Sequence, residues 1–151
     1  VQALVSQAGF GNARRMVSGF DYNRCCMLIA VLEKRCGFRF GDFDTYLNVV
    51  GGLKMDEPAS DLVVCLALAS GLTDRPLKED IIAFGEVGLA GELRSVGNVG
   101  QRISEAMQLG FKSCILPTKC YAQIKGHYPE SFTLYPVSTL QGAFKAAFGE
   151  K

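Results

Sequence analysis

The apolar run at residues 62–69 places the strongest constraint on the fold of this 151-residue chain. It follows Ser60 and Asp61, two residue types that favour the N-cap of a helix, and it offers no polar side to water. A helix that is apolar on every face has to be surrounded by other elements. The run is also far shorter than the ~20 residues that a membrane-spanning helix needs. We therefore expect residues 1–151 to form one soluble domain around a central helix, with no membrane contact.

A second helix is expected between Asp21, a favourable N-cap, and Gly37, a favourable C-terminal stop. Its apolar side chains recur at helical spacing, and Met27 carries the apolar surface round to the opposite side. Such a helix has more apolar surface than one core face needs. The pattern predicts that it either packs on two sides or lies at a contact between subunits.

Helices and strands alternate along the rest of the chain, without a repeat or a low-complexity linker. A glycine-marked turn between residues 81–87 and 92–96 predicts a hairpin. Two more helices are expected, one capped by Asn98 and one capped by Ser138 or Thr139. Further strands are expected at residues 1–7, 15–19, 46–50, 113–116 and 132–137. This order predicts an α+β fold in which helices pack on a mixed sheet.

Three segments that carry chemistry follow one another in a fixed order, at residues 57–61, 84–94 and 96–102. The order resembles the proteolytic domain of Lon proteases, in which a serine nucleophile precedes a hairpin and a lysine base follows it. In that frame the serine position is Ala59 and the lysine position is Gly100. The resemblance therefore implies a Lon-protease-like fold that is catalytically degenerate, with no catalytic residue.

Ser60 and Lys54 offer an alternative, a Ser–Lys peptidase of the Lon type. Such catalysis needs a hydroxyl within about 3 Å of a lysine whose pKa has been lowered by burial. Ser60 lies one residue past the nucleophile position, a shift that turns a helical side chain by about 100°. We expect Ser60 to cap the central helix and Lys54 to be exposed and ion-paired, because it precedes Asp56 and Glu57. Arg102 cannot replace the base, since its guanidinium stays protonated.

Basic residues are concentrated near the start of the chain. Residues 1–40 carry six basic and two acidic side chains, whereas the other 111 residues carry ten basic and thirteen acidic ones. Such an asymmetry can mark a surface that faces phosphate groups, and it also arises by chance on surfaces of this size. The candidate phosphate contacts are Arg14, Arg15, Arg24, Lys34 and Arg35.

The cysteines and the single histidine indicate neither a metal site nor a cofactor. The six cysteines form no Cys-x-x-Cys pair, and most lie in apolar runs, where a free cysteine behaves as a small hydrophobe. His127 has no partner histidine, and we expect it to be structural. The chain also lacks a phosphate-binding P-loop sequence. These observations predict reduced thiols in a cytoplasmic protein, with no metal and no cofactor.

A narrower resemblance covers the chain up to about Pro117. The segments that match the C-terminal domain of the bacterial RadA family, also called Sms, are 12–15, 19–24, 30–35, 46–54, 56–62, 84–89 and 101–103. Members of this family join a zinc finger and a RecA-like ATPase to the Lon-like domain and act as hexameric DNA-dependent motors of branch migration. The resemblance implies that this chain is a fragment without the finger and the ATPase, which alone neither hydrolyses ATP nor unwinds DNA.

The same resemblance implies two tasks for the domain. It would be a scaffold that joins copies of itself into a ring, a hexamer, and it would contact duplex DNA through the basic residues near its start. A pure oligomerisation module without DNA contact remains the alternative to this pair of tasks.

Overall fold

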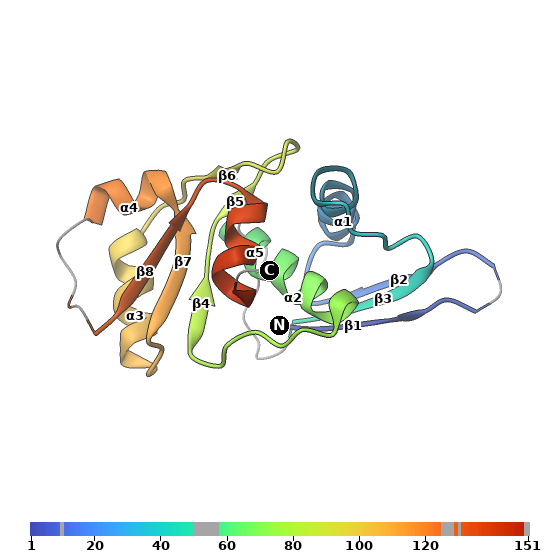
Figure 1. Ribbon diagram of the computed structural model, residues 1–151, viewed down its shortest axis with the longest axis horizontal. Helices are drawn as coiled ribbons and strands as arrows, with labels where there is room; N and C mark the ends of the chain where they lie inside the picture. Colours follow the sequence, from blue (N-terminus) through green and yellow to red (C-terminus); the bar gives the residue numbers. More distant parts are fainter. Residues whose placement is uncertain (10, 50–57, 125–128, 130, 150–151) are drawn as a thin grey trace.

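The structure, a computed structural model, describes residues 1–151 except 10, 50–57, 125–128, 130 and 150–151. The helices are α1 (Tyr22–Cys36), α2 (Asp61–Thr73), α3 (Val99–Gln108), α4 (Thr118–Ile124) and α5 (Leu140–Phe148), and a 3₁₀ turn, η1 (Pro58–Ser60), leads into α2. The strands are β1 (Gln2–Gln7), β2 (Arg15–Ser18), β3 (Phe43–Asn48), β4 (Ile81–Ala83), β5 (Glu86–Val87), β6 (Leu93–Arg94), β7 (Ser113–Pro117) and β8 (Thr133–Val137). Figure 1 shows α2 between two groups of elements, one on each side of it.

Helix α2 is the centre of the fold, as its sequence predicts. Leu62, Val64 and Leu68 are fully buried. Side chains of β1, α1 and α5 belong to the same core cluster as these residues, so α2 is enclosed from several directions. The helix continues to Thr73, beyond the apolar run, where the chain turns at Asp74 in the left-handed conformation.

The group at the N-terminal end is a three-stranded sheet in the order β1-β3-β2, with β1 antiparallel and β2 parallel to β3. Side chains alternate between its two faces, as the period of a strand requires. Ala3, Val5 and Val17 pack against the main core, whereas Leu4 and Met16 lie on the opposite face and are 62% and 57% exposed. The sheet therefore has one face in the core and one face open to solvent.

Helix α1 begins and ends where the sequence predicts. Asp21 accepts a hydrogen bond from the backbone N–H of Arg24 at 2.8 Å, and Gly37 ends the helix in the left-handed conformation with φ of 77°. Of the two predicted alternatives for its apolar surface, the described contacts support packing on more than one side. Met27 is half-buried against the main core, and Ala30, which is exposed, is too small to form an apolar surface of its own.

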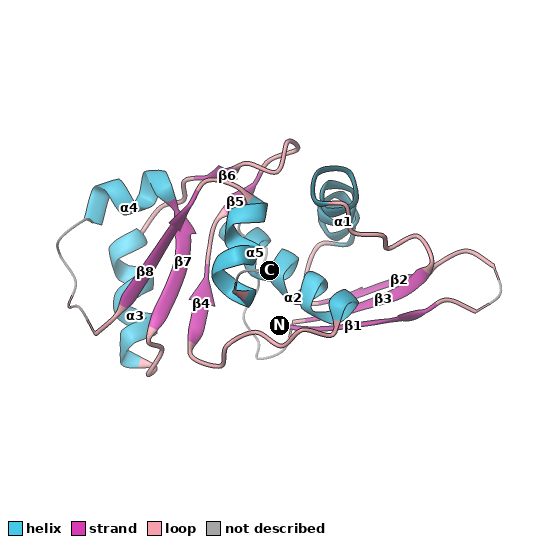
Figure 2. Cartoon of the chain, viewed as in Figure 1, coloured by secondary structure: helices cyan, strands magenta, loops and turns pink. Residues whose placement is uncertain are grey.

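The group at the C-terminal end is a parallel sheet in the order β4-β7-β8. All residues of β7 are buried because helices cover both faces of this sheet. Ile115 contributes to the main core with α2 and α5, while Cys114 and Leu116 contribute to a second core with α3 and α4. Figure 2 shows α3 and α4 on one side of the strands and α5 on the other.

The predicted hairpin at residues 81–96 is confirmed only at its turn. Strands β5 and β6 pair antiparallel, but β4 leaves the hairpin and joins the parallel sheet beside β7. The chain changes direction at Gly85, whose φ is +155° and where a Cβ would lie 3.1 Å from Cγ of Pro117. A glycine is thus required where the chain passes from one sheet to another.

The fold is α/β in character with separate sheets, rather than the one mixed sheet that we expected. Strand β3 begins at Phe43, three residues before the predicted start, and α4 was not predicted. Thr139 caps α5 as predicted, by accepting a hydrogen bond from Gly142 N at 3.1 Å. Asn98 precedes α3 in a left-handed conformation, and its side chain makes no capping hydrogen bond.

Candidate functional site

Ala59 is held at the mouth of α2 by the backbone of a distant segment. Its carbonyl oxygen accepts a hydrogen bond from Gly85 N at 2.9 Å, and Gly85 O accepts one from Leu62 N at 3.1 Å. The side chain of Ala59 is only 4% exposed. The position that holds the nucleophile in the Lon frame is therefore fixed by backbone contacts that do not depend on a serine.

A cavity of about 210 Å³ lies in front of this position, and its lining residues are Pro58, Ala59, Glu86, Ser95, Val96, Gly97 and Arg102. Among the described residues of this lining, Ser95 supplies the one hydroxyl side chain, and none is a lysine or a histidine. Arg102 donates from Nε to Gly97 O at 2.8 Å and lies over the ring of Phe84. Gly100 is the second residue of α3 and is not part of the lining. We call this space the Ala59 cavity.

The alternative pair, Ser60 and Lys54, is not assembled within the described residues. Ser60 occupies the N-cap position of α2, but its backbone is helical and its hydroxyl makes no capping hydrogen bond, so the predicted capping role is wrong. The residue is buried and does not line the Ala59 cavity. Lys54 lies outside the residues that the structure describes, as do Asp56 and Glu57.

Asp61 is a fully buried charged residue, and the sequence alone did not reveal its role. Its two carboxylate oxygens accept hydrogen bonds from Nε and a terminal nitrogen of Arg24. One of these oxygens also accepts from Val87 N at 3.0 Å. The hydrogen bond with Asp61 raises the pKa of Arg24 above its usual value, although burial opposes this effect. Asp61 therefore joins α1, α2 and β5. Arg24 also lies 3.8 Å from Glu86, which lines the Ala59 cavity.

The far end of the β5–β6 hairpin carries a second ion pair, between Glu92 and Arg94, at 3.2 Å. Glu92 also accepts a hydrogen bond from Ala90 N at 3.1 Å. Its carboxylate folds over Gly88, where any Cβ would collide with it. Hydrogen bonds from the backbone of Glu92 itself and of Ala90, together with Arg94, lower the pKa of Glu92. This carboxylate is consequently charged and compensated at neutral pH.

Two of the five predicted phosphate contacts, Arg15 and Arg24, are half-buried and bind partners inside the molecule. Arg24 binds Asp61, as described above. Arg15 donates from its guanidinium to Phe43 O at 2.7 Å and to Phe40 O at 2.9 Å. It thereby ties β2 to the chain segment that enters β3. These contacts give both arginines a structural role that competes with binding of a phosphate group.

The other three predicted contacts, Arg14, Lys34 and Arg35, are exposed. Arg14 precedes β2 and its backbone N–H donates to Asp44 Oδ1 at 2.7 Å, while Lys34 and Arg35 lie in the last turn of α1. Arg35 donates from Nε to Leu89 O at 3.3 Å, in the turn of the hairpin. The five residues thus do not form one cluster of free cations.

The six cysteines are free thiols. Burial raises the pKa of Cys25 to about 11 and also raises the pKa of Cys65 and Cys114. These thiols are therefore protonated and poor ligands at neutral pH. Among the described residues, no group of three or more His, Cys, Asp or Glu residues is arranged to hold a metal ion. His127 lies outside the described residues.

Sequence reasoning missed a larger cavity of about 520 Å³ that shares Ser95 with the Ala59 cavity and contains Lys119. No sequence signal could have located it, because its residues come from three segments that are far apart in the chain.

In the part of the chain that the structure covers, no helix combines the length and the apolar character needed to cross a membrane.

Comparison with known proteins identifies the family. The Lon protease (S16) C-terminal proteolytic domain matches residues 38–150. The DNA repair protein RadA of Halalkalibacterium halodurans is 42% identical over 150 residues, which is 99% of this chain and 32% of the relative. RadA of Bacillus subtilis is 43% identical over 150 residues, again 99% of this chain and 32% of the relative.

RadA of Escherichia coli is 43% identical over 143 residues, which is 95% of this chain and 30% of that protein. This chain thus spans about a third of the length of these relatives. Its similarity to them extends over nearly all of its own residues. The chain belongs to the Lon protease C-terminal proteolytic domain family and corresponds to the Lon-like domain of RadA proteins.

Proposed function

We propose that this domain works in DNA repair and recombination as a non-catalytic member of the Lon family. It would form the oligomerisation scaffold and a duplex-DNA contact of a RadA-type ATP-dependent branch-migration motor. The observation that carries the proposal is the Ala59 cavity. Its backbone frame holds Ala59, the position that the resemblance to Lon gives to the nucleophile, and none of the described lining residues carries an amine or an imidazole. Acyl transfer by a Ser–Lys pair needs both groups in contact.

The names of the relatives support the DNA repair role, since each of the proteins compared above is called a DNA repair protein. For DNA contact within the predicted set, the exposed residues Arg14, Lys34 and Arg35 are the better candidates. Arg15 and Arg24 would have to give up internal hydrogen bonds before they could bind a phosphate. Backbone phosphate contacts of this kind are independent of base sequence and weaken with salt.

Self-association is proposed through the open face of the β1-β3-β2 sheet. Leu4 and Met16 are both opposite Tyr46 of the middle strand, so the three side chains form a row across this face. Leu4 and Met16 are among the most exposed large apolar residues of the described chain. A second copy of this domain would cover the row in a ring, the assembly that the family resemblance implies.

The test joins two measurements on the purified chain. Binding to a labelled duplex at low salt should be detectable and independent of sequence, and it should fall steeply as salt rises. A fluorophosphonate probe, which labels activated serines, should leave the protein unmodified. Labelling that disappears in Ser60→Ala would establish the Ser60–Lys54 peptidase instead. Absence of duplex binding, together with formation of a ring, would establish the pure oligomerisation module.

A further inference from the structure

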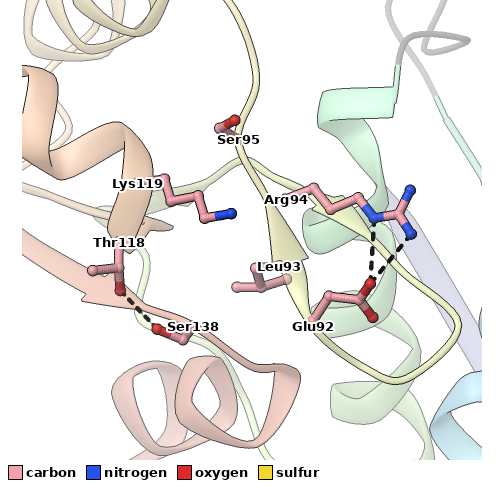
Figure 3. A pocket seen from close by; sticks show the side chains of 7 residues that line it. All are labelled: Glu92, Leu93, Arg94, Ser95, Thr118, Lys119 and Ser138. Carbon is pink, nitrogen blue, oxygen red and sulfur yellow. Dashed lines mark hydrogen bonds and ion pairs between the residues drawn. The ribbon is translucent and has the colours of Figure 1, made fainter.

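The larger cavity lies where the strands β7 and β8 end, and Figure 3 shows the side chains around it. Thr118 directly follows β7, and Ser138 directly follows β8. These strands are parallel, so their C-terminal ends meet at the same edge of the sheet. Ligands of parallel α/β sheets bind characteristically outside this edge. The short strand β6 and Ser95, from the hairpin, form the opposite wall. We call this space the Lys119 cavity.

The uncompensated charge in this cavity is positive. In Figure 3 the ammonium group of Lys119 extends into the space between Ser95 and Leu93, and no other described residue forms an ion pair with it. Arg94 instead turns towards Glu92, with which it is paired at 3.2 Å. The one carboxylate of the lining is therefore already neutralised, and Lys119 is left with no counter-charge in the described part of the wall.

Three hydroxyl side chains also line this cavity. Ser95, Thr118 and Ser138 all line the cavity. Thr118 Oγ1 and Ser138 Oγ share one hydrogen bond at 3.0 Å, in which either oxygen can be the donor, so one hydroxyl hydrogen of the pair remains available. A lysine ammonium has three N–H donors and no acceptor. The cavity thus presents mainly donors, which suits an anion that has several oxygen atoms.

The volume of the cavity and the residue types of its lining indicate which class of anion it can bind. A volume of about 520 Å³ far exceeds one phosphate group, so the ligand extends beyond its charged group. None of the described lining residues is aromatic, so they offer a base no platform on which to stack. A mononucleotide would lack its usual anchor here, whereas the backbone of a polynucleotide needs only contacts to its phosphates.

We propose that the Lys119 cavity binds a phosphodiester group of a nucleic-acid backbone. Lys119 supplies the charged contact, and Ser95, Thr118 and Ser138 supply neutral hydrogen bonds. This inference rests on the proposed function, since it names a site for the DNA contact of the domain. It differs from the sequence-based expectation, which places the contact among basic residues of the first forty.

The test compares Lys119→Gln with Lys112→Gln in duplex binding by this chain over a range of salt. Lys112 is exposed and lies just before β7, whereas Lys119 lies just after it, so the two changes remove the same charge at opposite ends of one strand. Lys119→Gln should weaken binding about fivefold and reduce the slope of log affinity against log salt by about 0.9, the value for one lost phosphate contact. Lys112→Gln should change neither quantity. Lys119→Arg should retain most of the affinity because the charge is kept.

A second arm separates the two sources of phosphate. Inorganic phosphate, titrated into labelled protein, should shift the NMR signals of Ser95, Thr118 and Ser138 only weakly, whereas a short duplex should shift them strongly. Saturation by inorganic phosphate without any effect of the duplex would overturn the proposal in favour of a free-phosphate site. Competition by poly-glutamate that equals competition by duplex would overturn it in favour of an acidic protein partner.

The two proposals fail in different ways. If the chain binds duplex, and Lys119→Gln and Lys112→Gln weaken binding equally, the Lys119 cavity is not the contact, although the proposed function stands. If the wild-type chain does not bind duplex at low salt under conditions where it forms its native assembly, the DNA-contact part of the proposed function fails, and this inference fails with it. Sedimentation of each variant verifies that ring size is unchanged.

Discussion

The Ala59 cavity and the Lys119 cavity share the lining residue Ser95, but they differ in whether the charged side chains nearby are paired. Behind the Ala59 cavity, next to its lining residue Glu86, Asp61 is fully buried and bound to Arg24 and to the backbone of Val87. The Lys119 cavity has exposed walls and a cation without a counter-charge among the described residues. The first has an alanine at the position that the resemblance to Lon gives to the nucleophile. The second has the charge that a ligand needs.

Burial likewise separates two ion pairs, one between α1 and α2 and one in the hairpin. In the Arg24–Asp61 pair the carboxylate is inaccessible and the arginine side chain is 29% exposed. In the Arg94–Glu92 pair the side chains are 59% and 43% exposed. Residue type is alike in the two pairs, and burial is what differs. If burial decides the role of each residue, then the same type of substitution should destabilise the protein at a buried residue and have little effect on stability at an exposed residue of similar type.

The largest effect is expected from Asp61→Asn. The change removes the charge that Arg24 binds and weakens the acceptor for Val87 N, and loss of one partner of a buried pair costs about 3 kcal/mol of unfolding free energy. Urea denaturation followed by circular dichroism measures it. The control, Arg94→Gln, breaks the exposed pair and should cost less than about 1 kcal/mol. Equal losses would mean that burial does not distinguish the Arg24–Asp61 pair from the Arg94–Glu92 pair.

Two methionines allow the same comparison in the N-terminal half of the molecule. Met27→Glu places a charge against the main core and should lower the free energy of unfolding by about 2 kcal/mol. Met16→Glu changes an exposed side chain on the open sheet face, so it should leave stability within about 0.5 kcal/mol. Analytical ultracentrifugation should then show smaller species for Met16→Glu. A wild-type chain that is monomeric at every concentration would contradict the proposed interface.

Features of the fold that depend on contacts between residues close in the sequence could be predicted, whereas features that depend on contacts between distant residues could not. The caps of α1 are local, and Asp21 and Gly37 marked both of its ends correctly. The Arg24–Asp61 pair joins residues 37 positions apart, so no local pattern could show that Arg24 was already bound. The departure of β4 from the hairpin depends on Gly85 packing against Pro117. Asp61 did carry a usable signal, because a carboxylate at the head of an apolar helix needs a buried partner.

The site was likewise predictable only in part. The motif order placed Ala59 at the mouth of α2, and the structure has a cavity there. The charge pattern selected five basic residues without regard to their partners. Lys119 was not selected because it stands alone in the sequence, and its surroundings exist only after β7 and β8 have paired.

Restoring the two missing residues tests whether the Ala59 cavity is still an enzyme frame. Ala59→Ser with Gly100→Lys should be labelled by a fluorophosphonate probe, since the backbone contacts of Ala59 do not depend on its side chain. Neither single variant should be labelled. The added groups are small or near the surface, so stability should fall by about 1 kcal/mol at most. A folded double variant without labelling would show that the Ala59 cavity does not support a Ser–Lys pair.

The smallest effect is expected at Arg14 and Arg15. These two arginines are adjacent in the sequence, so they allow an exposed residue to be compared with a half-buried one of the same type. Arg14 is exposed, so Arg14→Ala should leave stability unchanged and weaken duplex binding about threefold. If its guanidinium contacts one phosphate, the slope of log affinity against log salt should also fall by about 0.9. Arg15 binds the carbonyl oxygens of Phe40 and Phe43, so Arg15→Ala should lower the free energy of unfolding by about 1–2 kcal/mol. Fluorescence anisotropy at several salt concentrations measures duplex binding, and urea denaturation measures the free energy of unfolding.

A loss of DNA affinity for Arg15→Ala that matches the loss for Arg14→Ala, without a loss of stability, would mean that Arg15 leaves its internal partners to bind DNA. In that case burial would not decide the roles of these residues, and the basic region near the start of the chain would act as one surface.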